Sequence, residues 1–257
     1  MSTCYRPIEV FVKTAGHAYL FPCGRCASCL NRRKQQWIHR IQAENMYSTF
    51  KYKYFVTLSY QDKYLPFISR KSVHSEVIST GESLLNPLDL RNFIERFRHL
   101  MPGKFSYFAC GEYGKPQFTQ RPHYHLCIFC NTDWQTTLNK VNLAWSYLRA
   151  ESRVARYQRL KRDPSSKYDH DNMLNRDLIG RTQVKSLSYR RMSYIAKYVN
   201  KQFGDDDKAV PCFYRCSNGL GKSFLSSQEA ALLSAGNIHY SHLESGMPCS
   251  ISHSFVP

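Results

Sequence analysis

Residues 123–130 read HYHLCIFC, and residues 104–110 read KFSYFAC. Both stretches are short, apolar and rich in aromatic residues, which is typical of strands. A polar connection that contains Lys115 and Pro116 separates them. Strands that lie so close in sequence are readily joined as an antiparallel pair. The two stretches therefore predict such a pair, with Glu112 just beyond the end of the first strand.

A further strand and a well-marked helix precede this pair. Residues 52–60, YKYFVTLSY, alternate and contain aromatic and β-branched residues, which predicts a strand. Asn86 can cap a helix that follows, Pro87 suits its first position, and Gly103 is expected to end it. Apolar side chains recur on one face of this helix: Leu90, Phe93, Ile94, Phe97, Leu100 and Met101.

The remaining elements are predicted from weaker patterns. Apolar spacing indicates helices over residues 31–48, 132–150 and 190–203, and residues 183–189 are expected to form a short strand. Residues 64–86 are expected to be a long connection, and residues 151–178 a charged insert that faces solvent or DNA. Because the strands come as neighbours rather than in strict alternation with helices, the α+β class is favoured, with an antiparallel sheet flanked by helices.

Composition divides the 257 residues into three regions. Residues 1–30 are rich in Cys, Gly and Pro and are expected to form a separate N-terminal element. Residues 31–205 carry the predicted strands and helices of the main domain, and residues 206–257 form a Ser-rich C-terminal extension.

The charge balance indicates a polyanionic partner. Lys and Arg number 36 against 19 Asp and Glu, which gives a formal net charge of +17. Such an excess favours nucleic acid through counterion release. Aromatic residues make up 14% of the chain and can stack on unpaired bases. A basic protein with no nucleic-acid partner is the plainer alternative, because net charge says nothing about fold.

The chain is expected to act in a reducing cytoplasm. No apolar run approaches the length of a membrane span, so no membrane partner is expected. The N-terminal stretch MSTCYRPIEVFVKTAG lacks the basic-then-apolar order of a signal peptide. The ten cysteines are therefore expected to be free thiols or metal ligands rather than disulfides.

Two histidines and a glutamate form a candidate metal site. His123 and His125 are two residues apart on a predicted strand, so both imidazoles point to the same face. If the two strands pair, Glu112 can lie beside them. Two imidazoles and a carboxylate, with open coordination positions, suit Mn²⁺ or Mg²⁺ acting as a Lewis acid on a phosphate oxygen. The alternative is a pair of ordinary histidines near a strand end and a surface glutamate.

A tyrosine-rich helix is the third candidate feature. Tyr194 and Tyr198 are four residues apart and share one helical face, with Lys197 beside them. A phenol has a pKa near 10 in peptides, so it is a poor nucleophile unless nearby charge steadies the phenolate. A metal ion and a lysine would supply that charge. The alternative is an amphipathic core helix with aromatic anchors.

Metal ligands followed by a tyrosine-lysine helix resemble the HUH endonucleases, which are named for a His-hydrophobic-His motif. The resemblance spans roughly residues 20–225 and is closest to the replication initiators of the microviruses, particularly the gokushovirus branch. The segments that carry it are Pro22-Cys23-Gly24-Arg25-Cys26-Ala27-Ser28-Cys29, Trp37, Thr57-Leu58-Ser59-Tyr60, Cys110-Gly111-Glu112-Tyr113-Gly114, Arg121-Pro122-His123-Tyr124-His125 and Tyr194-Ile195-Ala196-Lys197-Tyr198-Val199-Asn200-Lys201.

The resemblance implies a rolling-circle replication initiator that nicks and rejoins a single-stranded DNA origin. It implies that Tyr194 and Tyr198 are successive nucleophiles that form a covalent 5′-phosphotyrosine, that Lys197 steadies charge, and that His123, His125 and Glu112 hold Mg²⁺ or Mn²⁺. The free 3′-hydroxyl would serve a host polymerase, with a host helicase, in the cytoplasm of a bacterial cell.

The resemblance also implies a fold, a five-stranded antiparallel sheet of the RRM or ferredoxin-like kind. One residue departs from the family pattern, because Tyr124 fills the usually aliphatic middle position of the His-x-His motif. Its side chain is expected to face the core, where its hydroxyl needs a partner.

The N-terminal cysteines form a second candidate metal site. Cys23, Cys26 and Cys29 offer three thiolates at short spacing, and Cys4 could be the fourth ligand of a structural zinc site. Ordinary reduced cysteines are the alternative. Cys212 and Cys216 are a further candidate pair.

A glycine-rich stretch near the C-terminal end hints at nucleotide binding. Gly219-Leu220-Gly221-Lys222-Ser223 resembles part of a phosphate-binding loop, but Cys216 stands where that motif needs Gly. A fused NTP-driven helicase is therefore not expected.

Two other functions compete with the nicking enzyme. The charge, the aromatics and the cysteines would also suit a non-catalytic, zinc-stabilised protein that binds single-stranded nucleic acid. Two histidines and a carboxylate are also the ligand set of non-haem iron oxygenases, although the basic charge and the tyrosine helix argue against that class.

Overall fold

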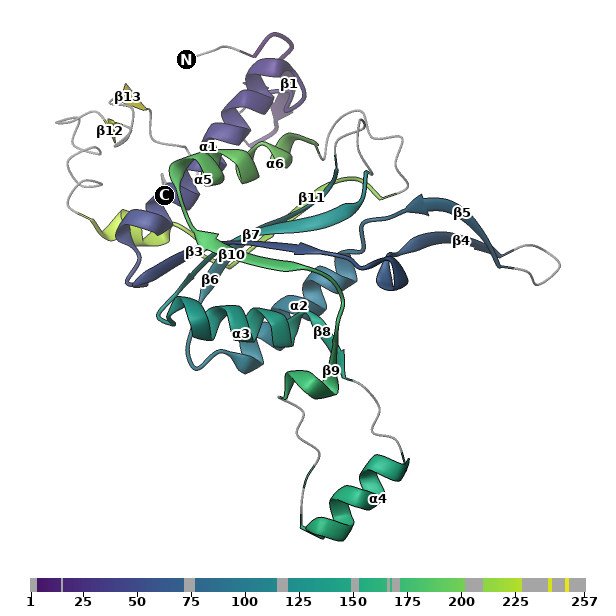
Figure 1. The fold of residues 1–257 in the computed structure, drawn as a ribbon. Helices are drawn as coiled ribbons and strands as arrows, with labels where there is room; N and C mark the ends of the chain where they lie inside the picture. The colour runs from purple at the N-terminus through teal and green to yellow at the C-terminus, as the bar shows by residue number, and fades with distance from the viewer. Residues whose placement is uncertain are drawn as a thin grey trace.

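The computed structural model describes residues 4–14, 16–71, 77–114, 120–148, 153–165, 167, 172–201, 210–227, 240–241 and 248–249 (Figure 1). Its centre is a five-stranded antiparallel sheet in the order β10-β3-β7-β6-β11. These strands are β10 (Thr182–Ser186), β3 (Tyr52–Ser59), β7 (Pro122–Cys130), β6 (Ser106–Tyr113) and β11 (Phe213–Cys216). The predicted α+β class with a central five-stranded antiparallel sheet is confirmed, including the pairing of β6 with β7.

Helices cover both faces of the sheet (Figure 1). On one face lie α2 (Pro87–Leu100) and α3 (Trp134–Ala144), and on the other lie α1 (Ala27–Tyr47), α5 (Tyr189–Ala196) and α6 (Tyr198–Lys201). Each face therefore has its own hydrophobic core.

Alternation along β7 assigns its side chains to these two cores. Tyr124, Leu126 and Ile128 pack toward α2 and α3, whereas Cys127 and Phe129 pack toward α1, α5 and α6. Because side chains of a strand alternate between faces, His123 and His125 share the face of the tyrosine helix.

Helix α2 forms for the reasons that its sequence predicts. The side chain of Asn86 accepts a hydrogen bond from the Leu88 amide, and Pro87 occupies the first turn. Leu90 and Phe93 are among the buried residues of the predicted apolar face. The helix ends at Leu100, two residues before Pro102.

The predicted long connection over residues 64–86 is wrong. Within it lie the end of a 3-10 turn (Asp62–Tyr64) and the antiparallel strands β4 (Phe67–Lys71) and β5 (Val77–Ser83). The serines obscure the pattern, yet Ile68, Val77 and Ile78 supply the β-branched residues that favour strands.

Helix α3 ends earlier than the predicted residue 150. It stops at Ala144, and β8 (Ser146–Leu148) then pairs with β9 (Arg176–Leu178), which a 3-10 turn (Met173–Asn175) precedes. The change of direction lets the Trp145 indole donate to the Ser59 carbonyl at 2.8 Å, which anchors this buried ring in the core.

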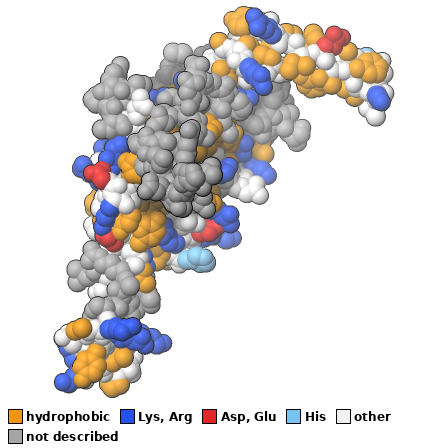
Figure 2. All heavy atoms as spheres, turned by 90° about the vertical axis from the view of Figure 1, so that its right-hand side faces the viewer, with side chains coloured by type: hydrophobic (Ala, Val, Ile, Leu, Met, Phe, Trp, Pro, Cys, Tyr) orange, Lys and Arg blue, Asp and Glu red, His pale blue; other side chains and the backbone are white. Residues whose placement is uncertain are grey.

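Between these strands the charged insert carries helix α4 (Arg153–Arg162), as the structure describes it. This helix stands away from the body of the molecule and presents Lys and Arg side chains beside apolar ones (Figure 2).

The N-terminal region contains an antiparallel hairpin of β1 (Ile8–Val12) and β2 (His17–Phe21), which the sequence reading did not predict. No described helix is both long enough and apolar enough to cross a membrane.

Beyond residue 206, β11 pairs with β6, so residues assigned to the C-terminal extension supply the outer strand of the sheet. A 3-10 helix (Lys222–Ser226) follows, as do the short strands β12 (Tyr240–Ser241) and β13 (Pro248–Cys249). The three-region division itself stays a prediction, and the three aspartates after Gly204 lie outside the described residues.

The Gly219–Ser223 stretch has a structural explanation. The Gly221 amide donates to Glu44 of α1 at 2.7 Å, and a Cβ at Gly221 would lie 2.6 Å from the Arg40 carbonyl oxygen. Arg40 in turn donates to the Leu220 carbonyl. These contacts dock the segment against α1, and they explain why glycine is needed at position 221.

Candidate active site

The structure brings together the three residues that the sequence identifies as candidate metal ligands. Antiparallel register places Glu112 of β6 opposite His123 of β7, and Cys110 opposite His125. One ligand atom from each of Glu112, His123 and His125 lies within 4.8 Å of the other two. The cluster therefore follows from strand pairing and alternation together.

Both imidazoles turn their Nε2 atoms toward one carboxylate oxygen. Glu112 Oε1 lies 2.5 Å from His123 Nε2 and 2.9 Å from His125 Nε2. On the opposite side of each ring, His123 Nδ1 lies 3.0 Å from the Arg121 carbonyl oxygen and His125 Nδ1 lies 3.0 Å from Thr57 Oγ1. A carbonyl oxygen only accepts, so Nδ1 of His123 carries a proton, and a neutral ring then presents a bare Nε2 lone pair to the cluster.

The charge states in the cluster suit cation binding. Burial acts to raise the pKa of Glu112, but hydrogen bonds to His123 and His125 outweigh it and lower this pKa to about 2. Burial also lowers the pKa of His125 despite the nearby Glu112 carboxylate. An ionised carboxylate and neutral imidazole are the forms that bind divalent metals.

One oxygen of the cluster is left without a hydrogen bond. Glu112 is 2% exposed, and its Oε2 atom is buried with no hydrogen-bond partner among the described residues. A buried carboxylate oxygen in this state is costly unless a charged partner compensates it. The arrangement therefore fits a cation held by Glu112, His123 and His125.

The tyrosine helix directs one hydroxyl into this cluster. Tyr194 donates to Glu112 Oε1 at 2.9 Å, and Tyr198 donates to the Tyr194 oxygen at 2.9 Å. Tyr194 is 36% exposed and Tyr198 only 4% exposed. The two tyrosines thus form a chain from the core to the carboxylate, with Tyr194 at its accessible end.

Lys197 lies beside both tyrosine rings. Its Nζ atom is 4.1 Å from the centroid of the Tyr194 ring and 4.9 Å from that of Tyr198. Burial raises the pKa of Tyr194 well above its ordinary value, and the negative charge of Glu112 raises it further. The phenol therefore stays protonated in the arrangement that the structure shows.

Packing of α5 fixes the orientation of Tyr194. Met192 and Ile195 are buried in the core between the sheet and α1, which leaves Tyr194 directed toward β7. Its ring meets that of His125 edge to face at a centroid distance of 5.3 Å. The helix is interrupted at Lys197, so the predicted continuous helix over residues 190–203 is wrong, although Tyr198 still lies one turn from Tyr194.

Three residues that support the site were not assigned roles from the sequence. Thr57 lies opposite His125 in the pairing of β3 with β7, which explains its contact with Nδ1. Arg121 holds the entry to β7 through a hydrogen bond to the Tyr60 carbonyl and an ion pair with Asp62. The signal was present in the Thr57–Tyr60 and Arg121–His125 segments, but only strand register reveals the contacts.

The expectation for Tyr124 is confirmed. Its side chain is fully buried on the face opposite the histidines. Its hydroxyl donates to the Asn86 carbonyl at 2.8 Å and lies 2.7 Å from the Tyr60 hydroxyl. The larger side chain thus links β7 to the start of α2 and leaves the metal-facing side unchanged.

Comparison with known proteins agrees with this geometry. Residues 53–203, more than half of the chain, match the family model of the replication-associated protein ORF2. The chain belongs to this family. The matched range holds Glu112, both histidines, Lys197 and both tyrosines of the candidate site.

A named relative extends the similarity of this family member. The chain is 28% identical over 216 residues to the "Replication-associated protein ORF2" of Spiroplasma virus 4. The aligned region covers 81% of this chain and 58% of that relative. No solved structure matches the chain.

Proposed function

We propose that this protein is a rolling-circle replication initiator of the HUH, microvirus type, which nicks and rejoins single-stranded DNA at an origin. The observation that carries the proposal is the hydrogen bond from the Tyr194 hydroxyl to Glu112, the carboxylate shared by both histidines. Family membership and the similarity to a viral replication-associated protein support a role in viral replication.

The proposed metal is Mg²⁺ or Mn²⁺, held by Glu112, His123 and His125. Three protein ligands leave coordination positions for a phosphate oxygen, and the unsatisfied Oε2 of Glu112 supports a cation in this place. When bound, such an ion would act as a Lewis acid on the scissile phosphate. Nitrogen and oxygen donors without sulfur favour these metals over zinc in a closed site.

Tyr194 is the proposed first nucleophile. Its oxygen would form a bond to phosphorus while the bond from phosphorus to the 3′-oxygen breaks. The phenol proton would leave along the hydrogen bond to Glu112 Oε1, and the departing 3′-oxygen would take up a proton from solvent. The products are a 5′-phosphotyrosine and a free 3′-hydroxyl, and the energy of the phosphodiester is kept for rejoining.

Lys197 would steady the charge that develops in this reaction. Its ammonium group lies over both rings, 4.1 Å from the Tyr194 centroid and 4.9 Å from the Tyr198 centroid. A positive charge fixed near the reacting oxygen stabilises a developing phenolate and the phosphate beside it.

Tyr198 is the proposed second nucleophile. It is 4% exposed and donates to Tyr194, so its hydroxyl lies behind the first tyrosine. We therefore assign the first cut to Tyr194 and the resolving cut to Tyr198, after esterification of Tyr194 has changed their contact. The proposed partners are a single-stranded DNA origin and the replication polymerase and helicase of a bacterial host, in whose cytoplasm the protein would act.

The proposal is tested by covalent adduct formation. The full chain is incubated with Mn²⁺ and labelled single-stranded oligonucleotides that tile the genome encoding it, and adducts are resolved on a denaturing gel. We expect an adduct with the wild type and with the Tyr189→Phe control. Combined Tyr194→Phe and Tyr198→Phe should abolish it.

Two outcomes would contradict the mechanism. An adduct that survives in the double variant would exclude the tyrosines as nucleophiles. Salt-sensitive binding without any nick, unchanged by His123→Ala, would instead support the non-catalytic binding protein.

A further inference from the structure

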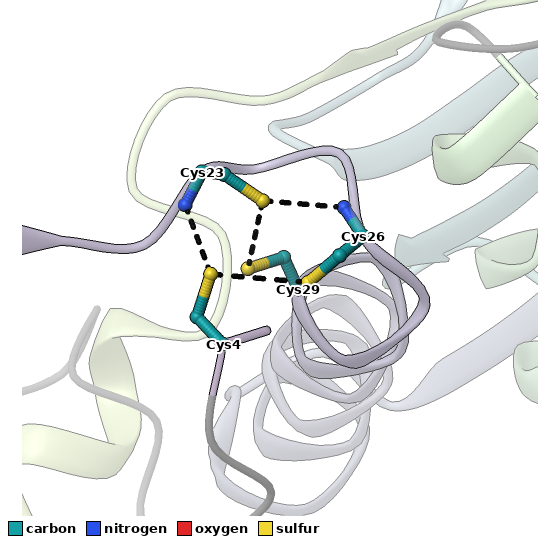
Figure 3. A group of neighbouring side chains, drawn as sticks. All are labelled: Cys4, Cys23, Cys26 and Cys29. Carbon is teal, nitrogen blue, oxygen red and sulfur yellow. Dashed lines mark hydrogen bonds between the residues drawn. The ribbon is translucent and has the colours of Figure 1, made fainter. Parts of the chain in front are cut away.

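The N-terminal cysteines meet in space although the sequence separates them. Sγ atoms of Cys4, Cys23, Cys26 and Cys29 all lie within 4.8 Å of one another (Figure 3). Cys23 Sγ lies 4.0 Å from Cys29 Sγ, and Cys26 Sγ lies 3.9 Å from Cys4 Sγ. A disulfide would need about 2.05 Å, so these sulfurs are not joined to one another.

The sulfur separations match a tetrahedral metal site. Zinc binds cysteine sulfur at about 2.3 Å, which places the corners of a regular tetrahedron about 3.8 Å apart. The separations of 3.9 Å and 4.0 Å lie close to this edge length. Four thiols from one chain segment and one distant residue therefore enclose a space of the right size for one ion.

The surrounding chain is arranged to support thiolates. Gly24 has a φ of +74°, a left-handed conformation that turns the chain between Cys23 and Cys26. The Cys26 amide donates to Cys23 Sγ at 3.4 Å, and the Cys23 amide donates to Cys4 Sγ at 3.3 Å. Hydrogen bonds from amides to sulfur stabilise the negative charge that metal-bound thiolates carry.

We propose that Cys4, Cys23, Cys26 and Cys29 bind one structural Zn²⁺. Four thiolates complete a tetrahedral shell and leave no open position for substrate, which distinguishes structural from catalytic zinc sites. The proposed nicking reaction does not depend on this ion, because its metal ligands are Glu112, His123 and His125.

The position of the cluster indicates what the zinc would do. Cys4 precedes β1 and Cys23 follows β2, so the ion ties together both ends of the hairpin. An isolated two-stranded hairpin is at best marginally stable in water. Most residues of β1 and all of β2 are exposed, and the hairpin projects from the body as a largely apolar arm (Figure 2). The hairpin therefore lacks a core of its own and depends on its anchored ends.

The same cluster fixes the start of α1. Cys29 is buried in the first turn of this helix, and the carbonyl of the next residue, Leu30, accepts a hydrogen bond from Asn200 of α6 at 2.9 Å. The zinc would thus anchor the hairpin to the helix that packs against α5 and α6, which carry the two tyrosines.

Metal content tests the site directly. The full chain is purified without added metal or chelator, and zinc and iron are measured per chain by mass spectrometry. We expect about one zinc per chain, as a closed four-cysteine site predicts. Cys26→Ser should lose it, whereas Cys216→Ser and the pair His123→Ala with His125→Ala should keep it. Iron in place of zinc, or zinc retained by Cys26→Ser, would overturn the proposal.

A second measurement uses the unmodified chain, so it does not depend on variants that fold. Cysteines are alkylated under native conditions before and after zinc is removed with a thiol-reactive mercurial followed by excess dithiol, and the modified peptides are mapped. Alkylation should increase at Cys4, Cys23, Cys26 and Cys29, and proteolysis within the β1–β2 hairpin should increase with it. Equal alkylation of these four thiols before and after treatment would show that no metal protects them.

Discussion

The two candidate metal groups of this protein are built in contrasting ways. The N-terminal group has four sulfurs, three of them from the short Cys-x-x-Cys-x-x-Cys segment before and within the first turn of α1. The group on the sheet has two imidazoles and one carboxylate, from two paired strands, with a tyrosine hydroxyl donating to it. The first is complete with protein ligands, and the second leaves room for a reacting group.

The difference teaches how each kind of site is positioned. Thiolates spaced three residues apart converge through local turns, so a short sequence segment specifies most of the cluster. The Glu112 group depends on register between β6 and β7, and its histidines are oriented by residues on other segments. A catalytic role for the second group and a structural role for the first make separable predictions.

The largest expected effect belongs to Tyr194→Phe. Removing the proposed nucleophile should reduce covalent adduct by roughly 10³-fold or more, because the covalent step is itself lost. Zinc content should be unchanged, which would separate the two metal groups. Tyr198→Phe should still form the first adduct but fail to release a joined circle. An adduct that maps to Tyr198 in the Tyr194→Phe variant would reverse the proposed order.

Glu112→Gln should have the next largest effect. Loss of the ligand charge removes several kcal/mol of metal-assisted catalysis, which corresponds to a rate reduction of roughly 10²–10³-fold. Single-turnover nicking measured across a Mn²⁺ titration checks it. Zinc bound per chain serves as the internal control and should not change. Full nicking by Glu112→Gln at the wild-type Mn²⁺ concentration would remove this carboxylate from the site.

Thr57→Val should have an intermediate effect. Its hydroxyl lies 3.0 Å from His125 Nδ1, and losing such an orienting contact reduces metal affinity by roughly 10–100-fold. Ser59→Ala is the matched control, because Ser59 lies on the same strand and its hydroxyl donates to the Arg181 carbonyl rather than to a histidine. The apparent Mn²⁺ affinity from nicking rates distinguishes them. Equal affinities for the two variants would mean that Thr57 does not orient the ring.

Much of this arrangement could be predicted from local patterns. The pairing of β6 with β7 followed from two apolar stretches close in sequence, and α2 followed from its apolar face and its Asn86 cap. The convergence of Glu112 with the histidines required only that pairing and the alternation of strand side chains. These features depend on neighbours in sequence, which is why the sequence sufficed.

The remaining features depend on contacts between distant residues. Strand β11 pairs with β6 across about one hundred residues, and it needs Gly111, where a Cβ would lie 2.9 Å from the Phe213 ring. The exposure of Tyr194 and the burial of Tyr198 depend on how α5 and α6 pack against α1 and the sheet. No local spacing encodes either outcome.

The smallest expected effect belongs to Arg32→Ala, and it examines the surroundings of the sulfur cluster as Thr57→Val examines those of the histidines. Arg32 Nη2 lies 3.7 Å from Cys29 Sγ, and the side chain is exposed, so solvent screens its charge. A contact of this kind contributes about 0–1 kcal/mol, equivalent to at most about a fivefold loss of zinc affinity in competition with a chelator. The zinc stoichiometry should remain unchanged, in contrast to Cys26→Ser. If Arg32→Ala lost the ion altogether, the cluster would depend on its surroundings as strongly as the catalytic group, and the contrast between a locally closed site and an externally oriented one would fail.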